Sequence, residues 1–236
     1  MLRSIADIFF PPVCPLCEAA LYSAPQLLCR KCLDGFDAGR ITGPVCTVCG
    51  DIFPSGSGAD HLCGECIKKT PPFTRARSAF AFEGSVLEAV HRFKYGGKVV
   101  LARALGHLLQ HAACLACPDA DVVMPVPLHR ARLRQRGFNQ SLMLARPVAK
   151  RLGCALDYMS LRRIRQTEAQ TKLKSSERRD NVSGAFELRG AGALKGKKVL
   201  LVDDVFTTGA TASQCAAVIK KAGAEVFIAT LARAVV

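Results

Sequence analysis

Residues 199–211 read Val-Leu-Leu-Val-Asp-Asp-Val-Phe-Thr-Thr-Gly-Ala-Thr and combine an apolar strand, two adjacent acids and a hydroxyl-rich turn that opens a helix. Backbone N–H groups at the start of a helix, together with threonine hydroxyls, are suited to hydrogen-bond a phosphate. A glycine in such a turn lets the backbone approach the anion closely. This pattern predicts a phosphate-binding loop made of Thr207, Thr208, Gly209, Ala210 and Thr211.

The two acids of this segment, Asp203 and Asp204, stand at the carboxyl end of the expected strand. Open α/β sheets bind their ligands at that end of the strands. Carboxylate oxygens accept hydrogen bonds from sugar hydroxyls and are the ligands that Mg2+ prefers. A purely structural strand-turn-helix with a capping threonine has no need of two acids before Thr-Thr-Gly-Ala-Thr. We therefore expect these acids to take part in ligand binding.

Four Cys-x-x-Cys pairs stand at nearly regular intervals in the first third of the chain. Two residues between cysteines let both sulfurs reach one ion, and eight thiolates make two closed four-cysteine zinc sites. The surrounding sequence has too little apolar material to form a core without metal. We therefore expect two structural Zn2+ sites. The expected ligands are Cys14, Cys17, Cys29, Cys32, Cys46, Cys49, Cys63 and Cys66.

The pairing of these motifs has two solutions. Sequential pairing gives two ribbons in series, and interleaved pairing gives a cross-brace; we favour sequential pairing. His61, two residues before Cys63, is a further candidate ligand, but four complete pairs leave it no vacancy. Cys114 and Cys117 are also spaced as Cys-x-x-Cys, but no second pair lies near them, and we interpret them as buried or partly exposed thiols.

A basic stretch at residues 126–140 is a second candidate anion site. It contains four arginines, whose guanidinium groups bind phosphate oxygens with several hydrogen bonds each. A solvated basic face or a nucleic-acid groove explains the same composition.

Two further polar segments are of interest. In residues 91–97 a basic residue stands beside glycines, which either let it approach a phosphate closely or simply end a helix. Residues 165–181 suit either a mobile lid or a solvated linker.

The elements that position these residues alternate between helix and strand after Pro71-Pro72. Apolar spacing predicts helices at residues 84–93, 99–116, 141–152 and 210–222, and strands at 121–126, 184–188, 198–203 and 225–231. This order predicts a mainly parallel α/β sheet with helices on both faces. Residues 11–72 show no sustained helical period and indicate a metal-stapled loop region. We therefore expect a double zinc ribbon at residues 1–72 and the α/β domain at 73–236.

Composition narrows the class of protein further. Of the net charge of +14, residues 1–72 contribute 6 Lys/Arg against 7 Asp/Glu, and residues 73–236 contribute 27 against 12, so the second part favours polyanionic partners. The chain has no Trp and only 3 Tyr, which leaves few rings for stacking single-stranded DNA. No apolar run is long enough to span a membrane, and the first residues lack a secretory pattern. A cytoplasmic protein is expected.

The segment at 199–211 resembles the phosphoribosyl pyrophosphate motif of type I phosphoribosyltransferases over its full length. The resemblance implies that Asp203 and Asp204 contact ribose hydroxyls, that Thr207 through Thr211 hold the 5-phosphate, and that Mg2+ binds with the ligand. Phe206 is bulkier than the residue often found there, which would narrow the pocket. This fold places its pyrophosphate loop after the first strand, which implies pyrophosphate contacts from His129, Arg130 and Arg136.

The whole chain resembles the ComF/GntX-like family of competence-associated proteins. The marks are the double zinc ribbon, Phe93-Lys94-Tyr95, the sequences at 125–129 and 136–140, Gln166-Thr167 and the phosphate loop. The resemblance implies a cytoplasmic protein needed for DNA uptake in transformation, which handles single-stranded DNA at the inner face of the membrane with other DNA-uptake proteins. Its zinc ribbons and its arginine-rich stretch are the expected DNA contacts. The alternative is a metabolic phosphoribosyltransferase that transfers the ribose to a nucleobase or amine, for which the sequence offers no recognisable acceptor pocket.

Overall fold

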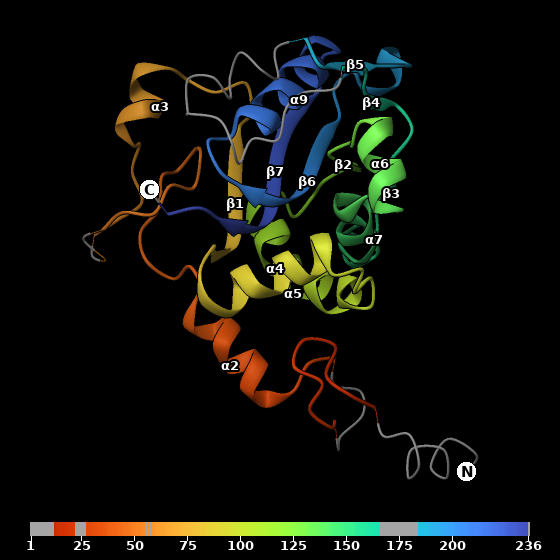
Figure 1. Ribbon diagram of the computed structural model, residues 1–236. Helices are drawn as coiled ribbons and strands as arrows, with labels where there is room; N and C mark the ends of the chain where they lie inside the picture. Colours follow the sequence, from red (N-terminus) through yellow and green to blue (C-terminus); the bar gives the residue numbers. More distant parts are fainter. Residues whose placement is uncertain (1–11, 22–26, 55, 57, 166–183, 236) are drawn as a thin grey trace.

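The computed structural model describes residues 12–21, 27–54, 56, 58–165 and 184–235 and has a five-stranded parallel sheet at its centre (Figure 1). Its strands follow the order β1-β7-β6-β2-β3, and every neighbouring pair is parallel. The strands are β1 (Arg75–Ala81), β2 (Val122–Pro125), β3 (Ala155–Leu156), β6 (Lys198–Phe206) and β7 (Glu225–Arg233). A separate antiparallel pair consists of β4 (Leu161–Arg163) and β5 (Phe186–Leu188).

Helices cover both faces of the sheet. On one face, α5 (Leu101–Ala116) packs on β7 and β1, and α7 (Gln140–Leu152) packs on β6 and β2. On the other face, α9 (Ala210–Lys221) packs on β7 and β6. Alternate residues of β6 serve the two sides: Leu200 and Val202 join the α5/α7 core, while Val199 and Leu201 join the α9 core. This alternation explains why the strand is an unbroken apolar run, as a strand buried on both faces must be.

The remaining helices flank this framework. α4 (Gly84–Tyr95) lies between α2 (Arg30–Ala38) and the sheet in Figure 1 and packs against α2. α6 (Arg130–Arg136) follows β2, α3 (Gly64–Lys68) belongs to the N-terminal region, and a short 3-10 helix spans Ala191–Leu194. None of the helices in the described ranges has both the length and the apolar character that a membrane-spanning helix requires.

The N-terminal region repeats one motif twice. In each copy the first cysteine, Cys14 or Cys46, closes a tight turn: its carbonyl accepts the amide of Glu18 or Gly50 at 2.8 and 2.9 Å, respectively. Glu18 and Gly50, each four positions after the first cysteine, both have positive φ, 65° and 72°, respectively. In each copy the third cysteine then precedes a helix, α2 or α3. The described residues of the N-terminal region therefore form a duplicated ribbon.

The expected α/β sheet with helices on both faces is confirmed, and all eight expected helices and strands of the second part are present. The expectation of no helical period before residue 72 was wrong, because α2 places Cys32 and Phe36 four residues apart on one buried face. In the second part, β1, β3, β4 and α6 were not anticipated. The lid or linker at 165–181 lies outside the described residues except for Arg165, and the boundary at 72/73 stays a prediction.

Candidate phosphate pocket and zinc sites

A cavity of about 750 Å3 lies at the carboxyl ends of β2 and β6. The acid pair and most of the predicted phosphate loop line it, together with side chains from α4, α6, α7 and β4. Four Lys/Arg residues face two acids in this lining. The charged lining residues are Lys94, Arg132, Arg136, Arg163, Asp203 and Asp204. Its volume is in the range of small-ligand sites, and the basic excess favours an anionic ligand.

The predicted phosphate loop is folded tightly around one glycine. Gly209 precedes the first turn of α9 with φ +70°, and the amide of Ala210 donates to Thr208 Oγ1 at 3.4 Å. A Cβ atom on Gly209 would lie 2.5 Å from Cζ of Phe206, so the backbone rests on that ring. Phe206 is buried at 5% exposure and packs edge-on against Phe73. Phe206 therefore supports the loop from below in addition to lining the cavity.

Gly209→Ala should destabilise the protein by about 1–3 kcal/mol, because the left-handed conformation and the contact with Phe206 both oppose a Cβ atom. Gly190→Ala is the matched control: Gly190 also has positive φ, but an added Cβ meets nothing within 4 Å. Chemical denaturation of both variants measures the difference. Equal losses in the two variants would show that the Phe206 contact contributes nothing.

The acid pair is held by three polar contacts. Asp203 accepts hydrogen bonds from Ser141 Oγ at 2.8 Å and from the amide of Asp204 at 2.9 Å. Asp204 pairs with Lys94, with 2.9 Å between Nζ and Oδ1. Burial, and then the adjacent charge of Asp204, raises the pKa of Asp203 to about 7. Asp203 therefore changes its charge near neutral pH in the ligand-free pocket.

This shifted pKa predicts a pH-dependent cost of folding. The ordinary pKa of the Asp203 carboxyl is 3.8 and rises to about 7 in the folded protein. Between these values the unfolded chain is ionised while the folded protein keeps the proton. The stability of the natural protein relative to Asp203→Asn should therefore fall as the pH rises from about 5 to about 7, by at most about 1.4 kcal/mol per pH unit. Denaturant unfolding of both proteins at several pH values measures this, and a flat difference would contradict the shift.

Three arginines converge on the cavity from two elements, Arg132 and Arg136 from α6 and Arg163 from β4. Burial, followed by the charge of Arg132, lowers the pKa of Arg163, and burial followed by Arg136 lowers that of Arg132. Like charges gathered in a partly desolvated space repel one another, and a bound anion would relieve that repulsion. The guanidinium of Arg136 also lies 5.1 Å from the ring centroid of Tyr95.

The side-chain amide of Gln140 in this wall has an unsatisfied donor among the described residues. Gln140 is 1% exposed and lines the cavity, and its Oε1 accepts Arg136 Nη1 at 3.2 Å. Its Nε2 has no hydrogen-bond partner among the residues described. Leaving a buried amide group unsatisfied costs about 1–3 kcal/mol. A ligand oxygen in the cavity would remove this cost.

Some of the site residues predicted from the sequence line the cavity, and others lie outside it. Asp203, Asp204 and Arg136 line the cavity, as do Thr207, Gly209, Ala210 and Thr211; Thr208 is not in the lining. His129 and Arg130 also lie outside it: His129 caps α6 through its Nδ1, which accepts the amide of Ala131 at 3.3 Å, and Arg130 is exposed.

Several lining residues were missed in the sequence. Arg132 stood within the basic stretch, and its spacing of four residues from Arg136 on a helix was the available signal. Lys94 lay in the stretch marked as a base beside glycines. Arg163, Gln140 and Ser141 gave no local signal, because tertiary folding alone brings them to the cavity.

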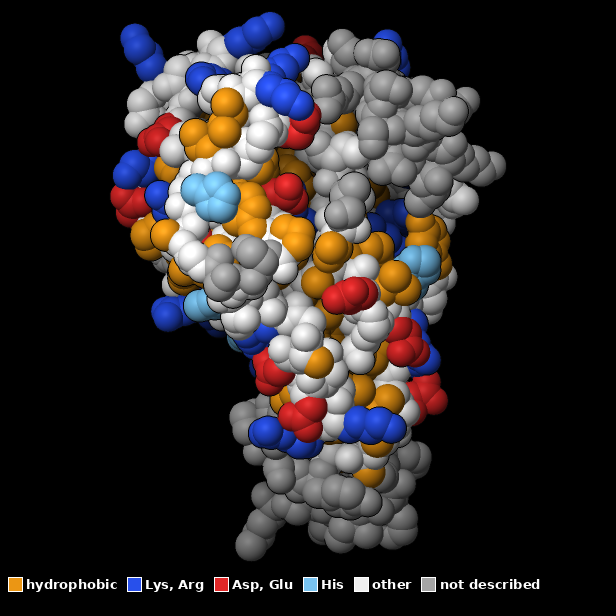
Figure 2. Space-filling model, turned by 90° about the vertical axis from the view of Figure 1, so that its left-hand side faces the viewer, with side chains coloured by type: hydrophobic (Ala, Val, Ile, Leu, Met, Phe, Trp, Pro, Cys, Tyr) orange, Lys and Arg blue, Asp and Glu red, His pale blue; other side chains and the backbone are white. Residues whose placement is uncertain are grey.

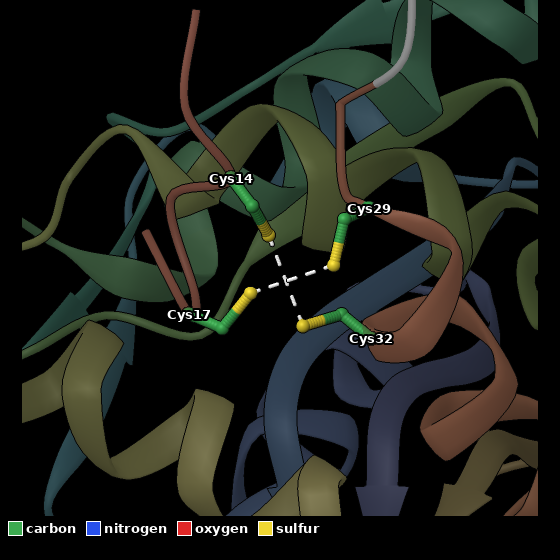
Figure 3. A group of neighbouring side chains, drawn as sticks. All are labelled: Cys14, Cys17, Cys29 and Cys32. Atoms are coloured by element: carbon green, nitrogen blue, oxygen red, sulfur yellow. Dashed lines mark hydrogen bonds between the residues drawn. The ribbon is translucent and has the colours of Figure 1, made fainter. Parts of the chain in front are cut away.

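The first zinc ribbon gathers Cys14, Cys17, Cys29 and Cys32, whose sulfurs point toward one centre (Figure 3). The sulfurs of Cys14 and Cys32 are 3.8 Å apart, and those of Cys17 and Cys29 are 3.4 Å apart. Four sulfurs placed tetrahedrally at about 2.3 Å from one zinc ion would be about 3.8 Å apart. The donor set and its spacing therefore fit Zn2+.

The second zinc ribbon gathers Cys46, Cys49, Cys63 and Cys66, with 3.6 Å between the sulfurs of Cys49 and Cys63. The cysteines are thus grouped sequentially, as favoured above. His61 belongs to neither group: its ring stacks on Phe53 and its Nδ1 lies 3.0 Å from the carbonyl oxygen of Ala59. Cys114 and Cys117 are also in neither group, and burial raises the pKa of Cys117 to about 12.

Both parts of the chain match known domain families. Residues 5–67 match the double zinc ribbon domain, and residues 139–234 match the phosphoribosyl transferase domain. Among solved structures, a purine phosphoribosyltransferase from Pyrococcus horikoshii superposes with a TM-score of 0.33 at 22% identity, over 59% of this chain and 74% of that chain.

Relatives with curated names match along most of the chain. The DNA utilization protein YhgH of Salmonella typhi is 33% identical over 219 residues, which cover 91% of this chain and 93% of that protein. Competence protein F of Haemophilus influenzae is 29% identical, with 92% and 94% covered. Competence protein ComFC of Bacillus subtilis is 27% identical, with 84% and 85% covered. With its double zinc ribbon and its phosphoribosyltransferase domain, the chain belongs to the ComF/GntX-like family.

Proposed function

We propose that the cavity binds phosphoribosyl pyrophosphate together with Mg2+, and that the protein acts in DNA uptake during natural transformation, where it handles single-stranded DNA. The observation that carries the ligand proposal is the meeting of the acid pair, the phosphate loop and a basic wall in one cavity. The names of the relatives, DNA utilization and competence proteins, support the biological role.

In this proposal each part of the cavity takes one part of the ligand. The loop around Gly209 holds the 5-phosphate with backbone amides and with the hydroxyls of Thr207 and Thr211. The arginines of α6 and β4 take the pyrophosphate. Asp203 and Asp204 accept the ribose hydroxyls and offer the carboxylate oxygens that suit Mg2+, an ion that commonly binds through one or two carboxylates and substrate phosphates. Mg2+ would neutralise charge on the pyrophosphate.

The direct test is calorimetric titration of the zinc-loaded protein with phosphoribosyl pyrophosphate in the presence and absence of Mg2+. Saturable binding at one site per chain that weakens without Mg2+ is the expected result. Heat no larger than that of dilution would overturn the ligand proposal.

For single-stranded DNA, the favourable surface is the pair α5 and α7. The two helices are in close contact, since Gln110 Nε2 donates to the carbonyl of Pro147 at 3.0 Å. Neither helix contains an acidic residue. Their exposed basic residues are Arg103, His107, His111, Arg146, Lys150 and Arg151. Acid-free basic surfaces suit the phosphate backbone, and neither helix carries Phe, Tyr or Trp for base stacking.

The N-terminal region is less suited to this task. On the face that Figure 2 shows, acidic and basic side chains alternate over the narrower lower part of the molecule, where α2 and the first zinc ribbon lie. This mixture agrees with the balanced charge of residues 1–72. We therefore place the DNA-binding surface on α5 and α7, and not on the ribbons.

Arg103→Ala/Arg146→Ala/Lys150→Ala should weaken single-stranded DNA binding about tenfold or more, and should lower the slope of log affinity against log salt by about 2, since each lost phosphate contact contributes about 0.7. The matched control, Lys31→Ala/Lys68→Ala/Lys69→Ala, removes three exposed charges from the ribbons. Fluorescence anisotropy with an oligonucleotide at several salt concentrations measures both. A larger loss in the control would move the DNA surface to the ribbons.

The alternative function is a metabolic phosphoribosyltransferase. In that reaction the bond between ribose C1 and pyrophosphate breaks, a bond from C1 to a nucleobase or amine nitrogen forms, and pyrophosphate leaves. The cavity has the charges for such a leaving group, because the basic wall faces the acid pair. A pyrophosphate-release assay with candidate acceptors discriminates the two, since binding without release favours a ligand-binding role.

A further inference from the structure

One buried guanidinium joins the second zinc ribbon to the phosphate loop. Arg233 ends β7 and is 6% exposed. Its Nη1 donates to the carbonyl of Cys49 at 2.8 Å, and its Nε and Nη2 donate to Asp51 Oδ1 at 3.2 and 2.9 Å. Its Nη2 also lies 3.9 Å from the sulfur of Cys49. The guanidinium is therefore seated on the turn that carries two of the cysteines.

The charge of Arg233 has a partner on that side. A zinc ion with four thiolates has a net charge of about −2, and hydrogen bonds to ligand sulfurs or to their backbone stabilise such centres. The Cys49 sulfur and carbonyl, together with the Asp51 carboxylate, give the guanidinium a negative surrounding in a buried position. The ribbon thus holds the side chain of Arg233 in one orientation.

On its other side, Arg233 faces the support of the phosphate loop. Its Cζ lies 4.7 Å from the ring centroid of Phe206, within cation–π distance. The main chains are joined as well, because the amide of Ala234 donates to the carbonyl of Phe206 at 2.9 Å. The ring of Phe206 in turn lies directly beneath Gly209. Movement of this ring would displace the loop that lines the cavity.

We infer that the second zinc ribbon positions the phosphate loop through Arg233 and Phe206, which makes Arg233 a positioning residue for the pocket. The ribbon is then more than a folding staple, because its order is transmitted to the anion site. The part of this inference that concerns binding of phosphoribosyl pyrophosphate rests on the proposed function. The mechanical coupling itself does not require that ligand.

The chain offers a matched control for this role. Arg77 Nη1 donates to the carbonyls of Cys46 and Thr47 at 3.4 and 3.2 Å, so Arg77 also anchors the second ribbon on the α/β domain. Its anchorage runs through β1, at the edge of the sheet. Among the described ring contacts, the cation–π contact to Phe206 comes from Arg233. Arg233→Met and Arg77→Met therefore both loosen the ribbon, but only the first removes the contact with Phe206.

The primary test is amide hydrogen exchange of the zinc-loaded full chain without ligand. In Arg233→Met, exchange should accelerate about tenfold both in the turn at residues 46–51 and in the loop at 207–213. In Arg77→Met it should accelerate in the turn alone. Unchanged loop exchange in Arg233→Met would overturn the inference, and so would equal acceleration of the loop in both variants. Phe206→Leu, which keeps an apolar side chain, should loosen the loop and leave the turn unchanged; loosening of the turn would also contradict it.

The second test uses the reciprocity of coupled sites. Saturating phosphoribosyl pyrophosphate with Mg2+ should raise the zinc affinity of the second ribbon, measured by equilibrium competition with a chelator, in the natural protein and should leave that of Arg233→Met unchanged. An equal rise in both proteins would overturn the role of Arg233. Absence of any ligand binding would overturn the proposed function alone, because the exchange experiment would still decide the coupling.

Discussion

Replacing both carboxylates of the acid pair, in Asp203→Asn/Asp204→Asn, should weaken binding of phosphoribosyl pyrophosphate with Mg2+ at least about a hundredfold at pH 8. Each carboxylate offers charge-assisted acceptors to the ribose hydroxyls, and such bonds contribute about 1.5–3 kcal/mol each. The pair also supplies the oxygen ligands that suit Mg2+. At pH 8 the carboxyl of Asp203 is largely ionised, because its pKa is about 7. Calorimetric titration measures the loss.

This variant is well suited to the test because the substitution relieves a strain of the ligand-free fold. The carboxylate of Asp203 is desolvated beside the charge of Asp204, so a neutral amide at position 203 should be tolerated or even stabilising above pH 7. A thermal melt confirms that the variant is folded. Glu187→Gln, at an exposed position of β5, removes a charge outside the cavity and should bind normally. Full affinity in the folded double variant would remove the acid pair from the site.

The parts of the pocket that were predictable from sequence are those written into one local segment. The strand that carries the acid pair near its carboxyl end and the helix that begins after Gly209 are consecutive in the chain. Their order alone brings the carboxylates and the loop to one edge of the sheet. The cysteine pairs are similar, because a Cys-x-x-Cys turn is local and needs only one second pair.

The opposite wall of the cavity could not be predicted in the same way. Arg163 reaches it from β4, and Ser141 contacts Asp203 across 62 positions of sequence. Such meetings depend on how the helices and strands pack, which residue spacing does not encode. β1 escaped detection for a related reason: it carries Arg75 and Arg77, and Arg77 is accommodated through hydrogen bonds to the carbonyls of Cys46, Thr47 and Ala76.

The other large effect concerns the zinc ribbons, where two double substitutions should leave different numbers of zinc ions per chain. Cys14→Ser/Cys32→Ser removes two ligands of one site and should leave one zinc ion per chain. Cys14→Ser/Cys46→Ser removes one ligand from each site and should leave none firmly bound, because structural zinc needs its complete set of four ligands. Each lost site should forfeit much of an apparent binding free energy of about 10–16 kcal/mol. Metal analysis after dialysis, with a thermal melt, measures both.

Interleaved pairing would reverse these results, which makes the pair of variants decisive. If the motif at Cys14 shared its ion with the motif at Cys46, the second variant would keep one ion and the first would lose both. The short sulfur-to-sulfur distances join Cys14 to Cys32 and Cys49 to Cys63, so each site should fail independently of the other. Because the second site also orients Arg233, its loss should reach the phosphate pocket even where the sheet remains folded.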